Sequence, residues 1–200
     1  MTDEPSQALT IEVSGSGAVS ALLTTPAAAH AAYVLAHGAG AGMHHPFMAA
    51  VASGLARRGV ATLRFQFPSM ERASRRPDPP RIAHAAVRAA VAEANRRLGG
   101  LPLFAGGKSF GGRMTSQAQS VSPLAGVLGL VFLGFPLHPA GRPGDERGEH
   151  LARVAFPMLF VQGSRDELAD VALVTALVAG PSRGMERKAE EDEAHDAGER

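Results

Sequence analysis

Five short runs of this sequence are largely apolar, and longer segments with helical periodicity separate them. The runs are AAYVLAH at 31–37, VATLRFQF at 60–67, LPLFAGG at 101–107, LGLVFLGF at 128–135 and FPMLFVQG at 156–163. Parallel strands that helices cover on both faces read as continuous apolar runs, whereas half-exposed strands alternate apolar and polar residues. The pattern therefore predicts an α/β fold with a mainly parallel sheet and helices on both faces.

The segments between these runs carry the start and stop signals of helices. Pro46 opens a predicted helix that continues to about Arg58, and Gly59 ends it. Two more helices are predicted over 81–97 and 110–120, and two early strands over 9–13 and 18–25. Residues 69–80 read as a polar loop. With 200 residues, of which 45% are apolar, the chain can form a single core. We expect one domain over 1–182 and a charged tail over 183–200.

Charge and cysteine content limit the partners that we expect. The net charge is +1, which gives no extended field for nucleic acid or an anionic membrane, so we expect a small-molecule substrate. Association of the chain with itself as a homo-oligomer stays open. Cysteine is absent, which fits a reducing compartment. The first ten residues, MTDEPSQALT, lack the pattern of a secretory signal, and a cytoplasmic location is therefore expected.

The stretch AGGKSFGGR at 105–113 has two interpretations, a phosphate-binding loop or a turn that exposes a nucleophilic serine. A P-loop needs a glycine five residues before its Gly-Lys-Ser, and that position is Pro102. The pattern Gly-x-Ser-x-Gly is met at 107–111, between a predicted strand and a predicted helix, as a nucleophile elbow requires. Gly107 and Gly111 are then needed because side chains there would collide with neighbouring backbone. We therefore predict Ser109 as the nucleophile.

A serine nucleophile needs a base, an acid that orients the base, and donors for the oxyanion. In α/β-hydrolases one donor follows the nucleophile and another lies in the loop after an earlier strand. Here the loop HGAGAGM at 37–43 follows the apolar residues AAYVLA at 31–36. His37, Gly38, Ala39 and Gly40 are therefore candidate oxyanion or substrate-binding residues, with Phe110. The acid should follow a later strand. Asp166 lies just after the run at 156–163, and Asp170 is its rival.

Six phrases in one order resemble a known family. They are HGAGAGMHHPFM, GVATLRFQFPSME, RRPDPP, LPLFAGGKSFGGRMTSQ, GLVFLGFPLHPAGRP and PMLFVQGSRDELAD. The chain is similar to small α/β-hydrolases related to dienelactone hydrolase, and more narrowly to the group that shares its domain with testis-expressed and histone-acetyltransferase-complex proteins. The resemblance implies an α/β-hydrolase fold with Ser109 as nucleophile, Asp166 as acid, and the amides of Phe110 and a residue near Ala39 as donors. It implies no cofactor and no particular substrate.

The resemblance is weakest at the C-terminal end, where the catalytic base is expected. His195 lies 29 residues after Asp166, close to the expected spacing. The preceding residues 183–194 read RGMERKAEEDEA, which offers almost nothing apolar for a last buried strand. His195 is therefore either the base or part of a charged tail without a catalytic role. The predicted function is a serine hydrolase of a small ester or thioester. A silent binding domain, or a lyase or transferase on the same scaffold, are the alternatives.

Charged and imidazole side chains near the predicted site have alternative interpretations. His44 and His45 are adjacent, a spacing that does not direct two imidazoles at one metal ion, so a surface role is favoured and no metal is expected. Lys108 and Arg113 flank the serine. They either favour an anionic substrate or are ordinary solvated surface charges.

Overall fold

The chain forms a seven-stranded mixed sheet in a computed structural model that describes residues 5–139, 141–142, 144–163 and 174–175. The strand order is β1-β2-β4-β3-β5-β6-β7. β1 and β2 pair antiparallel, β2 pairs antiparallel with β4, and all later pairs are parallel. The strands are β1 Ser6–Val13, β2 Gly17–Thr24, β3 Ala31–Ala36, β4 Val60–Phe65, β5 Leu103–Lys108, β6 Val127–Leu133 and β7 Met158–Val161. The mainly parallel α/β fold predicted from the apolar runs is confirmed.

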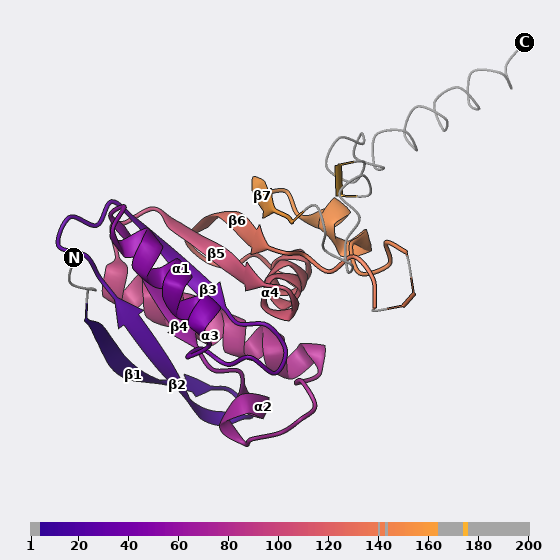
Figure 1. The fold of residues 1–200 in the computed structure, drawn as a ribbon, viewed down its shortest axis with the longest axis horizontal. Helices are drawn as coiled ribbons and strands as arrows, with labels where there is room; N and C mark the ends of the chain where they lie inside the picture. The colour runs from indigo at the N-terminus through magenta and orange to yellow at the C-terminus, as the bar shows by residue number, and fades with distance from the viewer. Residues whose placement is uncertain (1–4, 140, 143, 164–173, 176–200) are drawn as a thin grey trace, which may run out of the picture.

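Helices pack on both faces of this sheet (Figure 1). Met48 of one helix packs against Tyr33 and Leu35 on the first face, and the larger core cluster lies on the second. The helices are α1 Pro46–Ala56, α2 Pro68–Glu71, α3 Pro80–Leu98, α4 Phe110–Val121 and the 3-10 helix η1 Glu149–Arg153. α1 belongs to the first face, whereas α3 and α4 supply most helical residues of the larger cluster. None of the described helices is long and apolar enough to span a membrane.

Pro46 was a correct start signal, but two short helices were missed. Pro46 and Pro80 occupy the first turns of α1 and α3, where a proline costs no hydrogen bond. His45 caps α1, because its Nδ1 accepts a hydrogen bond from the N–H of Phe47. α2 begins one residue before the segment predicted as a polar loop at 69–80 and runs into it, and η1 was not predicted. A helix of four or five residues is too short to show a periodic pattern.

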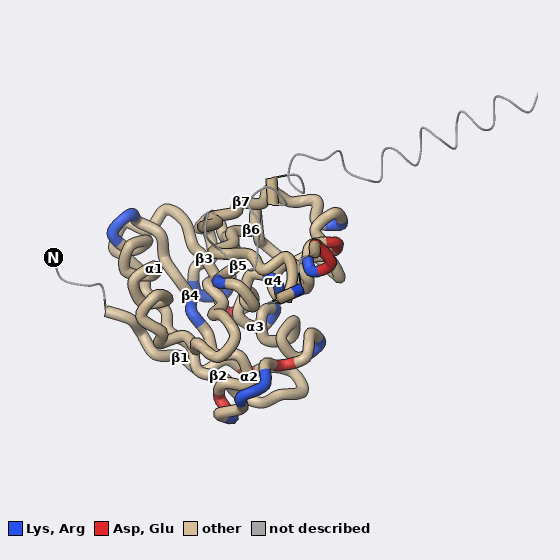
Figure 2. Tube along the Cα trace, turned by 45° about the vertical axis from the view of Figure 1, so that its right-hand side comes forward, with Lys and Arg blue, Asp and Glu red and all other residues tan. Residues whose placement is uncertain are grey.

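The loops that follow β3, β4, β5 and β6 lie at the same edge of the sheet, because these strands are parallel. In open α/β sheets this edge holds the binding crevice. Basic and acidic residues are spread over several elements and loops rather than collected on one (Figure 2). The candidate functional residues therefore have to be identified from their geometry at this edge.

Candidate active site

Ser109 is held in a strained backbone conformation between β5 and α4. Its φ and ψ angles are 48° and −112°, although it is not a glycine. Such angles cost about 1–3 kcal/mol and are found mostly at functional sites. The side chain is half-buried and makes no hydrogen bond to the start of α4. Its hydroxyl is therefore not used as a helix cap, which is the usual structural role of a serine at this position.

Glycines around Ser109 make room for the backbone of neighbouring strands. A Cβ atom on Gly107 would lie 2.1 Å from the carbonyl oxygen of Ala36, and one on Gly111 would lie 2.5 Å from the same oxygen. Real Cβ atoms do not approach oxygen so closely, so the steric reason given for both glycines is confirmed. Gly106 was not singled out from the sequence, yet a Cβ there would lie 1.8 Å from the carbonyl oxygen of Val131. The tight turn thus depends on β3 and β6 lying on either side of β5.

The loop after β3 lies directly beside Ser109. A Cβ atom built on Gly38 would be 3.9 Å from the Cβ of Ser109. The backbone N–H groups of Ala39 and Phe110 have no hydrogen-bond acceptor within the described part of the chain. Phe110 is the first residue of α4, where helix geometry leaves N–H groups free. The structure therefore brings the predicted donor residues close to the predicted nucleophile.

His37 is a buried, neutral residue that ties two loops together. The N–H of Phe67 donates to its Nε2 at 3.1 Å, so Nδ1 carries the proton and donates to the carbonyl oxygen of Gly38 at 2.7 Å. Burial lowers the pKa of His37, against smaller opposing effects of the Gly38 hydrogen bond and of the charge of Asp78. With both ring nitrogens engaged, His37 shapes the loop and is not available as a base.

Arg64 of β4 and Gln66, just after β4, hold the C-terminal end of the loop that follows β3. Gln66 Oε1 accepts a hydrogen bond of 2.7 Å from the N–H of Met43. Arg64 Nη1 donates to the carbonyl oxygen of Met43 at 3.3 Å, and the Arg64 side chain is buried. The sequence reasoning missed both roles. The polar letters R and Q inside the run VATLRFQF were the available signal.

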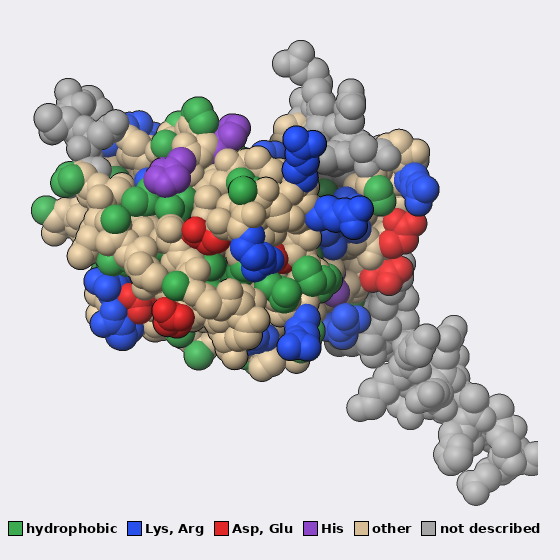
Figure 3. Space-filling model, turned by 90° about the horizontal axis from the view of Figure 1, so that it is seen from below, with side chains coloured by type: hydrophobic (Ala, Val, Ile, Leu, Met, Phe, Trp, Pro, Cys, Tyr) green, Lys and Arg blue, Asp and Glu red, His purple; other side chains and the backbone are tan. Residues whose placement is uncertain are grey.

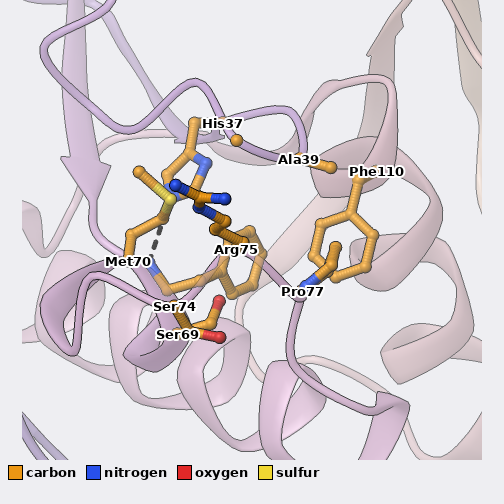
Figure 4. Close-up of a pocket in the computed structure, with 10 residues that line it drawn as sticks. His37, Ala39, Ser69, Met70, Ser74, Arg75, Pro77 and Phe110 are labelled. Carbon is orange, nitrogen blue, oxygen red and sulfur yellow. Dashed lines mark hydrogen bonds between the residues drawn. The ribbon is translucent and has the colours of Figure 1, made fainter.

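A small pocket opens next to this loop (Figure 4). His37, Ala39 and Gly40 line it together with Phe110, and the segment after β4 contributes Arg75. That segment is held by a buried carboxylate, which the sequence analysis also missed. Asp78 Oδ2 accepts a hydrogen bond of 2.7 Å from the N–H of Ser69, and its Oδ1 pairs with Arg72 at 3.0 Å. The pocket walls thus come from the loops after β3, β4 and β5.

The two basic residues that flank Ser109 each lie over an aromatic ring. Lys108 Nζ is 5.9 Å from the centroid of the Phe47 ring, and the Arg113 guanidinium carbon is 5.8 Å from that of Phe110. Burial lowers the pKa of Arg113, and the nearby charge of Arg147 lowers it further. Neither flanking residue has an acidic partner among the described residues. Basic side chains are prominent on the face that carries α2 and the adjoining loops (Figure 3).

A second serine–histidine contact joins α4 to η1. Ser116 Oγ lies 2.7 Å from His150 Nε2, and both side chains are buried. Burial lowers the pKa of His150 to about 4, with smaller effects from the charges of Arg153 and Arg113 and from His84. His150 is therefore neutral at physiological pH. Because this pair sits on the buried side of α4, it fastens η1 to the helix that begins at the candidate nucleophile.

The predicted acid and base lie outside the described residues. Asp166, its rival Asp170 and the candidate base His195 belong to the ranges 164–173 and 176–200. The structure therefore brings together Ser109, Phe110 and the loop His37, Gly38, Ala39 and Gly40, and it leaves the rest of the triad as a prediction. In the part of the chain that is described, no group of three or more His, Asp or Glu side chains forms a metal site.

The chain matches a known protein family and is similar in fold to several solved structures. A model of the "Alpha/beta hydrolase domain" family matches residues 29–199. The fold is similar to an alpha-beta serine hydrolase homologue from Coxiella burnetii, with a TM-score of 0.71 and 20% identity over 90% of this chain and 83% of that one. It is also similar to a serine hydrolase without lid from Xanthomonas campestris, with a TM-score of 0.66 and 22% identity over 87% and 78%. Dienelactone hydrolase from Anabaena variabilis matches with a TM-score of 0.64 and 18% identity over 89% and 94%.

Proposed function

Because this chain belongs to the alpha/beta hydrolase domain family, we propose that it is a serine hydrolase that cleaves a small ester or thioester through an acyl-enzyme. One observation carries the proposal. Ser109 is a strained residue whose hydroxyl does not cap α4, and it lies beside a loop in which the N–H group of Ala39 has no acceptor among the described residues. Strain of this kind is expected where a side chain must be presented for chemistry.

The proposed reaction follows from the roles of these groups. Ser109 Oγ attacks the carbonyl carbon of the substrate, and its proton passes to a base. The N–H groups of Phe110 and Ala39 stabilise the negative charge on the carbonyl oxygen. The bond to the leaving group then breaks, the leaving group takes the proton, and water releases the acyl group. Asp166 is proposed to orient the base. His195, which follows the nucleophile and the acid in the chain, is proposed to be that base.

A finer placement of the chain is part of the same proposal. We assign it to the dienelactone-hydrolase-like group that shares its domain with testis-expressed and histone-acetyltransferase-complex proteins, on the strength of six phrases in the family order. The substrate is proposed to be a small molecule, handled without a cofactor. A cytoplasmic location agrees with the absence of cysteine from the sequence.

One feature of the sequence favours a second candidate function. Residues 183–194 are almost entirely hydrophilic, so the segment before His195 has little to bury. A domain with a poorly held base keeps its binding surface and its oxyanion donors, and it acts mainly as a binding module. The two candidates differ in whether Ser109 reacts.

A fluorophosphonate probe tests the proposal. We expect the probe to label the full-length protein at Ser109, because the N–H groups of Phe110 and Ala39 can bind the phosphonyl oxygen. Ser109→Ala should abolish labelling and hydrolysis of p-nitrophenyl acetate. Ser122→Ala, at the other end of α4, is the matched control and should retain both. Labelling that survives Ser109→Ala, or a complete absence of labelling in the wild type, would refute the hydrolase.

A further inference from the structure

The pocket beside the candidate oxyanion loop has an inner wall of rings that fix one another. Phe67 packs edge-to-face against His37, with ring centroids 4.9 Å apart, and against Phe110, with centroids 5.3 Å apart. All three side chains are buried. Rings held in this way cannot move aside without losing close contacts with their neighbours. The depth of the pocket is therefore fixed.

A buried carboxylate holds another wall of the pocket in place. Asp78 accepts a hydrogen bond of 2.7 Å from the N–H of Ser69, and its other oxygen pairs with Arg72 at 3.0 Å. These two contacts tie together the ends of the segment 69–78. Met70 lies in this segment, and its half-buried side chain lines the pocket (Figure 4). The backbone of this wall is therefore held, and the side chain of Met70 limits the space inside it.

The pocket between these walls is small. Its volume is about 10 Å³, which is close to the space that one water molecule needs. A methyl group is of similar size. The lining also includes Ser69, Ser74 and Arg75, whose polar groups would lose water if an apolar chain covered them. A longer chain would in addition have to displace Met70 from its packing. The pocket thus suits one methyl-sized group.

The pocket adjoins the groups that would hold the carbonyl of a substrate. Ala39 and Phe110 line it, and their N–H groups are the proposed oxyanion donors. It lies on the β4 side of Ser109, whereas the proposed acid Asp166 follows β7 in the sequence. The leaving group has to lie toward the base that protonates it. The acyl group of the substrate is therefore expected on the opposite side, toward the pocket.

We propose that the substrate is an acetyl ester or an acetyl thioester, and that Phe67 and Met70 exclude longer acyl groups. This inference rests on the proposed serine hydrolase. The carbonyl oxygen accepts hydrogen bonds from the N–H groups of Ala39 and Phe110, and the acetyl methyl group occupies the pocket. The bond from Ser109 Oγ to the carbonyl carbon forms as the bond to the leaving group breaks. The leaving group takes the hydroxyl proton through the base, and water then releases acetate.

A series of p-nitrophenyl esters tests this inference on the unaltered full-length protein. Acetate, butyrate and hexanoate esters share the leaving group and differ only in the acyl chain. We expect kcat/KM to fall at least about tenfold from acetate to butyrate, after correction for the rates of the same esters with hydroxide. Ser109→Ala supplies the background rate. Equal values for acetate and hexanoate would overturn this inference alone. A lack of Ser109-dependent hydrolysis with every ester would overturn the proposed function as well.

Met70→Ala tests whether this side chain sets the limit. The variant enlarges the pocket, so the ratio of kcat/KM for butyrate to that for acetate should rise at least about tenfold. Met158→Ala is the matched control, because Met158 is also half-buried but lies in β7 and does not line the pocket. It should leave the ratio unchanged, and circular dichroism shows whether both variants are folded. The same ratio in a folded Met70→Ala and in the wild type would contradict the role of Met70.

Discussion

At the scale of single residues, the site depends on backbone positions that exclude ordinary side chains. Ser109 is strained, with φ 48°, and stays in place because Gly107 and Gly111 let β3 approach within contact distance. Strained residues persist only where the surrounding structure fixes them. Hydrogen bonds to both ring nitrogens of His37 contribute to that fixing, because they hold the loop beside Ser109.

Gly107→Ala should prevent stable folding rather than merely slow catalysis. The new Cβ would lie 2.1 Å from the carbonyl oxygen of Ala36, and the backbone φ of 149° already disfavours a side chain. We expect a loss of about 4 kcal/mol or more in the free energy of unfolding. Gly15→Ala is the control, because its φ is 73° and nothing lies within 4 Å, so it isolates the cost of the backbone conformation at about 1 kcal/mol. Urea denaturation measures both. Equal losses would contradict the steric explanation.

At the scale of secondary-structure elements, β4 and α4 organise the site from two sides. Arg64 and the neighbouring Gln66 hold the loop after β3 through the N–H and carbonyl groups of Met43. On the other side, η1 is fastened to α4 by the contact between Ser116 and His150. Adding a charge to a buried polar group costs free energy. The contact between Ser116 and His150 is therefore sensitive to pH.

Stability should fall on acidification through the titration of His150. Its pKa is about 4 in the folded chain and 6.5 without the fold, so the unfolded state binds the extra proton between these values. Stability from this group is complete above about pH 6.5, falls as the pH drops towards 4, and changes no further below. The loss is at most about 3.5 kcal/mol, at about 1.4 kcal/mol per pKa unit.

His150→Asn separates this effect from general acid denaturation, because asparagine retains hydrogen-bonding groups and does not titrate. Melting temperatures of both proteins should be compared from pH 8 to pH 4. The difference at pH 8 records the change in packing alone. We expect the wild type to lose more stability than the variant between pH 6.5 and 4. Parallel curves would show that His150 does not carry the pH dependence.

At the scale of the whole molecule, β7 is the last strand of the described sheet, while the proposed acid and base come from later residues. A catalytic side chain must be held within hydrogen-bond reach of the nucleophile. Apolar neighbours usually anchor the segment that carries it, and residues 183–194 offer very few. We therefore expect a slow hydrolase, in which the oxyanion donors supply much of the remaining catalysis.

His195→Ala should change the Ser109-dependent rate of p-nitrophenyl acetate hydrolysis by less than about twofold. The reason is that a base which is poorly held contributes little to the rate. The background is the rate of Ser109→Ala, which must be subtracted from both proteins. A robust activity that disappears in His195→Ala would show that the tail does deliver the base.

The sequence alone was sufficient for the fold class and for the turn at Ser109. Apolar runs and helical periodicity report the burial of each segment, and Gly107 and Gly111 report the local steric limits of the turn, so both can be recognised from adjacent residues. The steric partner of both glycines is Ala36, more than 70 residues earlier in the sequence. The sequence pattern indicated that side chains at positions 107 and 111 would collide with neighbouring backbone. The structure showed that this backbone is the carbonyl group of Ala36.

Only the tertiary structure decided how the site is supported. Gln66 binds Met43 across 23 residues, Ser116 meets His150 across 34, and the pocket combines loops from three strands. The contact of Gln66 and the walls of the pocket arise because β3 lies between β4 and β5 in the sheet, an order that no local pattern encodes. The exposure of Leu159 and Val161 is also a tertiary property, because an apolar sequence of this kind is typical of a buried strand.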